Sequence, residues 1–157
     1  MGHTVDLADA FASHEVRVYT YFRRMVGGRE VARDLTQETF VRALRGASRY
    51  AGEAPVDAWL LGIARNVFLE WLRKATRERP VERAEATEDP LPGSEVERLD
   101  VERALARLDP EHREILVLRF SLDLPGEEVA RLLDISHDAV RQRVVRAKDA
   151  FREVWED

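Results

Sequence analysis

A row of cationic, amide and apolar side chains near the C-terminal end of the chain has the chemistry needed to contact DNA bases. The segment 136–152 carries five Lys or Arg residues against two Asp, although the whole 157-residue chain has a formal net charge of −5. On a helix, at about 100° per residue, its outward face would hold Arg141, Gln142, Val145 and Arg146. Arginine can donate paired hydrogen bonds to guanine, glutamine can pair with adenine, and an exposed valine can contact a thymine methyl. These residue types at this spacing predict a helix that reads base edges in duplex DNA.

A short helix and a tight turn precede this row. The segment GEEVARLL (126–133) supplies apolar packing residues, and Asp134, Ile135 and Ser136 form a three-residue turn. Ser136 is a natural N-cap, and Asp134 stands where glycine is more usual, because this position often needs a positive φ that Asp tolerates better than most residues. The pattern predicts a helix–turn–helix motif whose second helix enters the major groove. The alternative is a charged amphipathic helix whose arginines are simply solvated.

The other side of the basic helix carries an apolar stripe that must pack inward. Its members are Val140, Val144, Ala147, Phe151 and Val154. Arg143 falls nearer to this stripe than the other arginines do. We therefore expect Arg143 to form an ion pair within its domain or to contact a phosphate, and not to read a base.

The segment 29–46 predicts an amphipathic helix with an unusual outer face. Its core stripe would consist of Ala32, Leu35, Thr36, Thr39, Phe40 and Ala43. The opposite side holds Asp34, Gln37, Glu38, Val41 and Arg45. A valine amid polar residues suggests a partner site, although single exposed apolar residues are normal on protein surfaces.

The segment 54–77 predicts a helix with two distinct faces. Its buried face would hold Leu60, Ala64, Val67, Phe68 and Trp71, and the other face holds Trp59, Gly62, Asn66 and Arg73. An aromatic ring, an amide and cations suit single-stranded nucleic acid, to which Arg65, Lys74 and Arg77 would add charge. The alternative is that Trp59 is simply half-buried core.

Both halves of the chain show helical periodicity and no convincing strand alternation, so we expect an all-α protein. Helices are predicted near 5–26, 30–46, 56–75, 95–107, 111–121, 126–133 and 137–153. The proline-containing acidic stretch between the halves predicts a flexible linker over 78–98, which joins two small domains at 1–77 and 99–157. A long loop within one domain is the alternative.

The composition excludes several classes of protein. The chain has no cysteine, so disulfides and thiolate metal sites are absent. The four histidines are scattered and no metal-ligand spacing or Ser/His/Asp constellation occurs, so we expect no enzyme, no metal and no cofactor. No stretch approaches about 18 uninterrupted apolar residues, which predicts a soluble, cytoplasmic protein without membrane insertion.

Taken together, three segments resemble a bacterial extracytoplasmic-function (group 4) sigma factor of the sigma-70 family. RDLTQETFVRAL (33–44) resembles region 2.2, and YAGEAPVDAWLLGIARNVFLEWLRK (50–74) resembles regions 2.3 and 2.4. The segment from LDPEHREIL to AFRE (108–153) resembles region 4. The order, the spacing and the short linker are also similar, and the resemblance covers nearly the whole chain.

The resemblance implies three binding surfaces and no catalysis. Core RNA polymerase would contact the chain through its β′ clamp coiled coil and its β flap, the former on Asp34, Gln37, Glu38, Val41 and Arg45. The promoter −10 element would be opened and held by the loop 50–55 and by Tyr50, Trp59, Gly62, Arg65, Asn66, Arg73 and Lys74. The −35 duplex would be bound by Ser136, His137, Arg141, Gln142, Arg143, Val145 and Arg146, and read chiefly through Arg141, Gln142, Val145 and Arg146. An anti-sigma factor is a further expected partner.

Some residues depart from the family pattern. Pro125-Gly126 replaces the usual polar cap of the first motif helix, and His137-Asp138 replaces a small or apolar pair. Asp138 could accept a hydrogen bond from cytosine or favour the helix N-terminus. Two other readings stay open, namely a self-sufficient helix–turn–helix regulator, which would be expected to dimerise, and a helical adaptor with an incidental basic helix.

Overall fold

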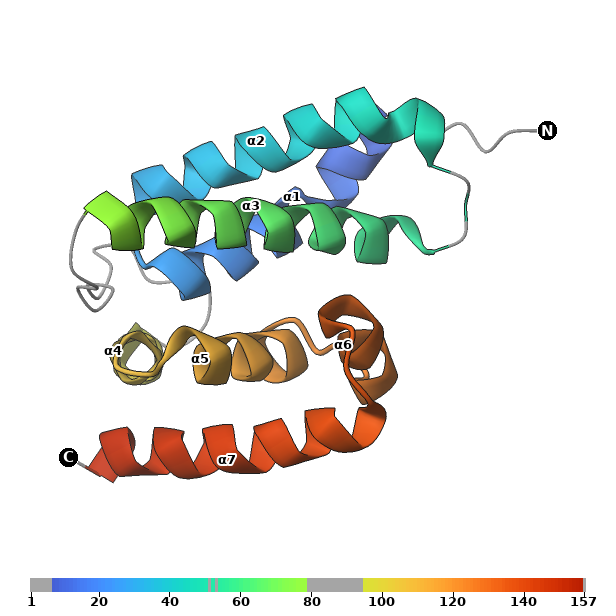
Figure 1. Cartoon of the computed structure of the whole chain (residues 1–157). Helices are drawn as coiled ribbons and strands as arrows, with labels where there is room; N and C mark the ends of the chain where they lie inside the picture. The colour runs from blue at the N-terminus through green and yellow to red at the C-terminus, as the bar shows by residue number, and fades with distance from the viewer. Residues whose placement is uncertain (1–6, 51, 53, 79–94, 157) are drawn as a thin grey trace.

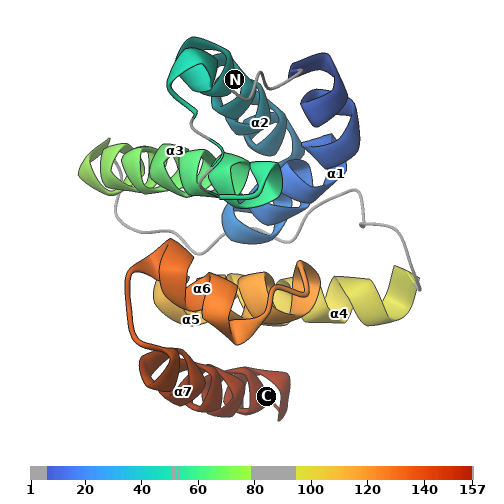
Figure 2. The ribbon, with the colours of Figure 1, turned by 90° about the vertical axis from the view of Figure 1, so that its right-hand side faces the viewer.

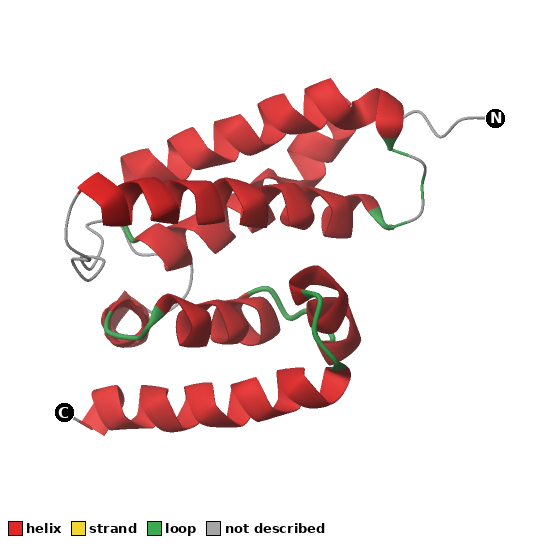
Figure 3. Cartoon of the chain, in the orientation of Figure 1, coloured by secondary structure: helices red, strands yellow, loops and turns green. Residues whose placement is uncertain are grey.

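The chain is helical throughout the part that the structure describes. The computed structural model describes residues 7–50, 52, 54–78 and 95–156, and all its regular elements are helices (Figure 3). The prediction of an all-α fold is therefore confirmed. Residues 79–94, which make up most of the predicted linker, lie outside the described residues.

The first helical unit is a bundle of three long helices (Figure 1). It consists of α1 (Leu7–Val26), α2 (Arg29–Gly46), a short 3₁₀ turn (Ala47–Arg49) and α3 (Val56–Glu78). The α1–α2 corner needs Gly27, because its φ of 80° lies in the left-handed region that favours glycine. All three helices pack against one another, with α1 behind α2 and α3 in Figure 1.

The predicted core stripes of this unit are nearly correct. Five of the six predicted residues on α2 are buried, and so are four of the five on α3. Leu35 and Trp71 are half-buried instead, and Leu61 is buried although it was not in the predicted stripe. On α1 the buried side chains include Val18, Tyr21, Phe22 and Met25. Large aromatic side chains thus supply much of this core.

The second unit contains the predicted helix–turn–helix. It consists of α4 (Glu95–Ala106), α5 (Pro110–Leu116), a π-helical turn η2 (Val117–Ser121), α6 (Gly126–Leu133) and α7 (His137–Glu156). The single helix predicted over 111–121 is wrong in its second half. After Leu116 the turns widen, and the N–H of Leu122 donates to the carbonyl of Val117 at 2.9 Å. The π turn has the geometry that commonly interrupts an α-helix as a local bulge.

Helix α5 is the central element of the molecule. It packs against α7 on one side and against α1 on the other, and α7 forms the outermost layer (Figures 1 and 2). Six consecutive residues, 113–118, are buried for this reason. The α3 helix also contacts α6, and the buried apolar residues of both units form one continuous cluster.

Candidate nucleic-acid interface

The turn between α6 and α7 has the geometry that the sequence predicts. Asp134 ends α6 with φ 55° and ψ 49°, and its N–H donates to the carbonyls of Ala130 and Arg131. The hydroxyl of Ser136 accepts a hydrogen bond from the N–H of Ala139 at 3.0 Å. The left-handed Asp134 and the N-cap Ser136 thus terminate one helix and begin the next within three residues.

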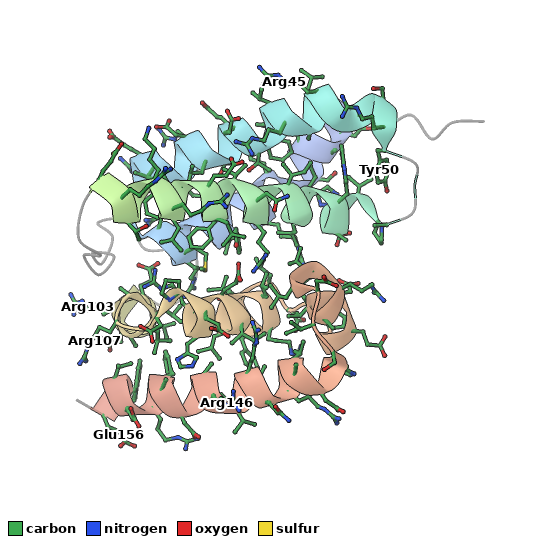
Figure 4. All side chains as sticks on the ribbon, viewed as in Figure 1. Arg45, Tyr50, Arg103, Arg107, Arg146 and Glu156 are labelled. Carbon is green, nitrogen blue, oxygen red and sulfur yellow. The ribbon has the colours of Figure 1, made fainter. Side chains whose placement is uncertain are left out.

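The outward row on α7 is open to solvent. Arg141, Gln142, Val145 and Arg146 are all exposed, with 60% of Val145 accessible. Figure 4 labels Arg146 on this outermost helix. On the inner face, Val140 and Ala147 are buried, while Val144, Phe151 and Val154 are partly buried against the core. The helix therefore presents a cationic surface with one apolar side chain, held in place by its inner stripe.

Two of the three α7 arginines that were predicted to contact the −35 duplex have carboxylate partners within the chain. Arg143 pairs with Glu111 of α5 at 3.3 Å, as an ion pair within the unit. Arg141 pairs with Asp138 one turn earlier on the same helix. The hydrogen bond from Arg141 lowers the pKa of the Asp138 carboxyl. This places a negative charge at the helix N-terminus, where it is favourable.

The unusual residues at the starts of α6 and α7 lie against each other. A Cβ atom built on Gly126 would come within 2.7 Å of the Nε2 atom of His137. The imidazole therefore occupies the space that a side chain at the start of α6 would fill. The two departures from the family pattern, Gly126 and His137, are therefore neighbours in space, and the small size of one leaves room for the ring of the other.

The predicted partner face of α2 is exposed along most of its length. Asp34, Gln37, Val41 and Arg45 are exposed, and Glu38 is partly exposed. Glu38 accepts a hydrogen bond from Arg42 at 2.9 Å, and Arg42 reaches Glu70 of α3 at 2.5 Å. Hydrogen bonding to Glu70 raises the pKa of Arg42 and lowers that of the Glu70 carboxyl. This ion network ties α2 to α3.

The residues predicted to bind single-stranded DNA on α3 differ in their exposure. Asn66, Arg73 and Lys74 are exposed, whereas Gly62 is partly buried. Arg65 is turned toward the second unit, where its Nε donates to Glu114 of α5 at 3.2 Å. Seven predicted residues thus do not form one continuous row.

The ring of Tyr50 lies against the ring of Trp59, with centroids 4.7 Å apart. The Tyr50 hydroxyl donates to the carbonyl of Ala54. Trp59 is partly buried and packs against the core, as the half-buried alternative proposed. The aromatic pair anchors the chain on either side of residues 51–55, of which 51 and 53 lie outside the described residues.

Sequence reasoning missed two features of this part of the molecule. One is the buried polar cluster around Glu114. The other is an apolar groove of about 440 Å³ on the second unit, lined by Val101, Leu105, Leu116, Phe120, Ser121, Lys148, Phe151, Arg152 and Trp155. The exposed aromatic residues Phe120 and Trp155 were the available signal for the groove.

Comparisons with known proteins agree with this two-unit architecture. The family model for Sigma-70 region 2 matches residues 10–78, and the model for Sigma-70, region 4 matches residues 98–151. The RNA polymerase sigma factor CarQ of Myxococcus xanthus is 35% identical, with 93% of this chain and 87% of that protein covered. The ECF RNA polymerase sigma factor SigE of Mycolicibacterium smegmatis is 34% identical, over 89% of this chain and 58% of that protein.

The chain therefore belongs to the sigma-70 family of RNA polymerase sigma factors. Within that family it is of the extracytoplasmic-function type, and a stand-alone regulator is not favoured.

A solved structure shares the fold. The sigma factor RpoE of Bartonella quintana, in complex with the anti-sigma factor NepR, superposes with a TM-score of 0.85 at 22% identity, over 96% of this chain and 97% of that one. In the part of the chain that the structure describes, no helix has the length and apolarity to cross a bilayer. The described residues also include no group of three or more His, Cys, Asp or Glu side chains placed so that they could hold a metal ion.

Proposed function

We propose that the outward row on α7 reads the −35 element of the promoter as duplex DNA. The observation that carries the proposal is this exposed row of Arg141, Gln142, Val145 and Arg146, which follows a well-formed helix–turn–helix corner in a family member. Ser136 and His137 lie at the helix N-terminus, near where a phosphate would approach. Arg143 would support the fold through Glu111 or contact a phosphate.

The −10 element is held by the first unit. Asn66, Arg73 and Lys74 offer an amide and two cations on one exposed side of α3. Tyr50 and Trp59 form the aromatic edge of this surface, and Gly62 lets a strand approach closely. Extruding a base costs a few kcal/mol, which stacking and a specific pocket can offset. Arg65 joins this surface only when it is released from Glu114.

Core RNA polymerase binds the exposed face of α2. Asp34, Gln37, Glu38 and Val41 would dock on the β′ clamp coiled coil, with Arg45 at the edge. The β flap would occupy the apolar groove of the second unit, whose rim carries Lys148 and Arg152. An anti-sigma factor, such as the one bound by the structural relative, would regulate the chain in the cytoplasm. The chain is an initiation subunit and has no catalytic role of its own.

The decisive test is transcription in vitro with purified core RNA polymerase, this protein and a pool of promoter fragments. We expect initiation that depends on the protein, and the transcript start sites would define both promoter elements. Failure of both polymerase binding and initiation with a matched polymerase would contradict the proposed function.

Two substitutions on α7 test whether its outward row contacts DNA. Arg141→Ala and Arg146→Ala should each reduce initiation about 10- to 100-fold, in line with about 1–3 kcal/mol per specific base contact. The matched control is Arg103→Ala, because Arg103 is an exposed arginine on α4 (Figure 4). An equal loss in the control would mean that total charge matters and not this row.

A further inference from the structure

A buried carboxylate joins the two helical units. Glu114 lies on α5 and is only 6% exposed. Its Oε2 accepts a hydrogen bond from the hydroxyl of Tyr21 at 2.6 Å, and its Oε1 accepts one from the Nε of Arg65 at 3.2 Å. Tyr21 belongs to α1 and Arg65 to α3, so both donors come from the opposite unit. A buried charge is costly unless it is paired in this way.

Two further arginines cross the same boundary. Arg113, the neighbour of Glu114, donates through Nη1 to the carbonyl of Met25 at the end of α1, at 2.6 Å. Its other N–H groups donate to carbonyls at the end of α4 and in the following turn. In the other direction, Nη2 of Arg17 on α1 donates to the carbonyl of Leu122 at 2.7 Å. The boundary is therefore crossed by directional polar contacts in both directions.

The polar contacts across this boundary can be exchanged for contacts with water. Water can replace a hydrogen bond to a carbonyl or a carboxylate when two surfaces part, so the net cost of opening is modest. Interfaces between domains of one chain are commonly of this polar kind, and relative motion is expected there. The continuous apolar cluster that spans both units opposes opening. The polar contacts fix the orientation in which the units meet.

We propose that Tyr21, Arg65 and Glu114 form a polar latch that holds the two units closed in the free protein, and that this latch must open before Arg65 can contact the −10 strand. The second part rests on the proposed function. In the closed form the cation of Arg65 faces Glu114, while Asn66 and Arg73 stay exposed on the same helix. In the closed form Arg65 is therefore not available to DNA, whereas the outward row on α7 is accessible.

The latch is tested by measuring the distance between the two units in the full-length protein. The chain has no cysteine, so Ser13→Cys on α1 and Glu153→Cys on α7 introduce two unique sites for a pair of fluorescent dyes. Both positions are exposed. We expect high energy transfer in the otherwise unchanged protein, and a population with lower transfer in Glu114→Ala and Tyr21→Phe.

The matched control is Glu111→Ala. Glu111 is on the same helix, but its ion pair with Arg143 stays within the second unit, so transfer should equal that of the parent. Circular dichroism shows which variants are folded, and Tyr21→Phe decides the outcome if Glu114→Ala does not fold. Low transfer in the parent protein, or unchanged transfer in a folded Tyr21→Phe and Glu114→Ala, would overturn the latch.

The competition for Arg65 has a separate readout. The same variants are titrated with a fluorescent single-stranded DNA 15-mer of randomised sequence. Opening by Glu114→Ala should tighten binding several-fold, and adding Arg65→Ala should remove that gain. If the units open and affinity for the strand does not change, the latch stands and the assignment of Arg65 to DNA is wrong.

Discussion

At the scale of single residues, Arg113 shows how one buried cation can close the end of a helix. Its guanidinium donates to the carbonyls of Leu105 and Ala106 in the last turn of α4 and to that of Leu108 just after it. The last carbonyls of a helix lack the full set of helical N–H donors, and of these three the carbonyl of Leu105 also accepts a backbone hydrogen bond, from the N–H of Leu108 at 3.1 Å. Burial lowers the pKa of Arg113, and each of its three guanidinium nitrogens donates to at least one carbonyl oxygen.

Replacing Arg113 with Met keeps the bulk of the side chain and removes its donors. We expect a loss of about 3 kcal/mol in the free energy of unfolding, because several buried carbonyls lose a charged partner at about 1.5–3 kcal/mol for the strongest of them. Urea unfolding followed by circular dichroism measures this loss. Arg103→Met, at an exposed position on α4, should stay within about 0.5 kcal/mol of the parent.

Tyr21 makes the stability of the folded protein decrease at alkaline pH. Burial, and then the nearby Glu114 charge, raise the pKa of its phenol well above the ordinary value. The unfolded chain therefore ionises first, and stability that is complete below about pH 10 is lost as the pH rises toward the folded pKa. The slope approaches about 1.4 kcal/mol per pH unit.

Comparing the parent with Tyr21→Phe isolates this contribution. The difference in unfolding free energy should be constant from pH 7 to 9 and should shrink above pH 10, because the variant lacks the ionising group. Urea titrations at each pH measure it. A difference that stays constant up to pH 11 would contradict the raised pKa.

At the scale of elements, the α6–α7 corner carries a small conformational strain. Asp134 adopts a left-handed conformation that costs most L-residues roughly 1–2 kcal/mol, less for Asp. Asp134→Gly should therefore stabilise the chain by about 0.5–1 kcal/mol, and Asp134→Val should destabilise it by more than that. Thermal unfolding of the three proteins gives the order, and a Val variant as stable as the parent would contradict the assigned conformation.

The same corner shows what the sequence predicts well. The N-cap at Ser136, the positive φ at Asp134 and the stripe around Val140 all follow from local rules about residue types and periodicity. Their partners are one to four residues away, so the information is contained in one segment. The π turn at 117–121 is different, because no residue pattern within the segment distinguishes it from an ordinary helix end.

At the scale of the whole molecule, local rules give no account of how the units meet. The partners of Glu114 are 49 and 93 positions away, and a carboxylate after an arginine is typical of a solvated face. Helical periodicity shows that a face is buried without showing which unit buries it. The sequence therefore predicted Arg65 as a DNA contact and not its pairing with α5, and the assignments of the polymerase and DNA residues stay predictions.

The continuous core predicts that the two units unfold together. Trp59 and Trp71 report on the first unit and Trp155 on the second, so fluorescence of Trp155→Phe and of a Trp59→Phe, Trp71→Phe double variant follows each unit separately. Both should give the same urea midpoint in the parent background. With Glu114→Ala added, the midpoints should separate, since the units lose the hydrogen bonds of Glu114 to Tyr21 and Arg65.

The pairing of Arg141 with Asp138 has a consequence for the ions around the promoter complex. A cation that meets a DNA phosphate normally displaces a condensed salt ion into solution, and the affinity then falls with a slope of about −0.9 per phosphate contact. Arg141 carries a counter-charge that belongs to its own helix, so its approach to the DNA would release few ions. The proposed DNA binding by α7 would then depend less on salt concentration, and Asp138→Asn should make binding tighter in dilute buffer and more sensitive to potassium.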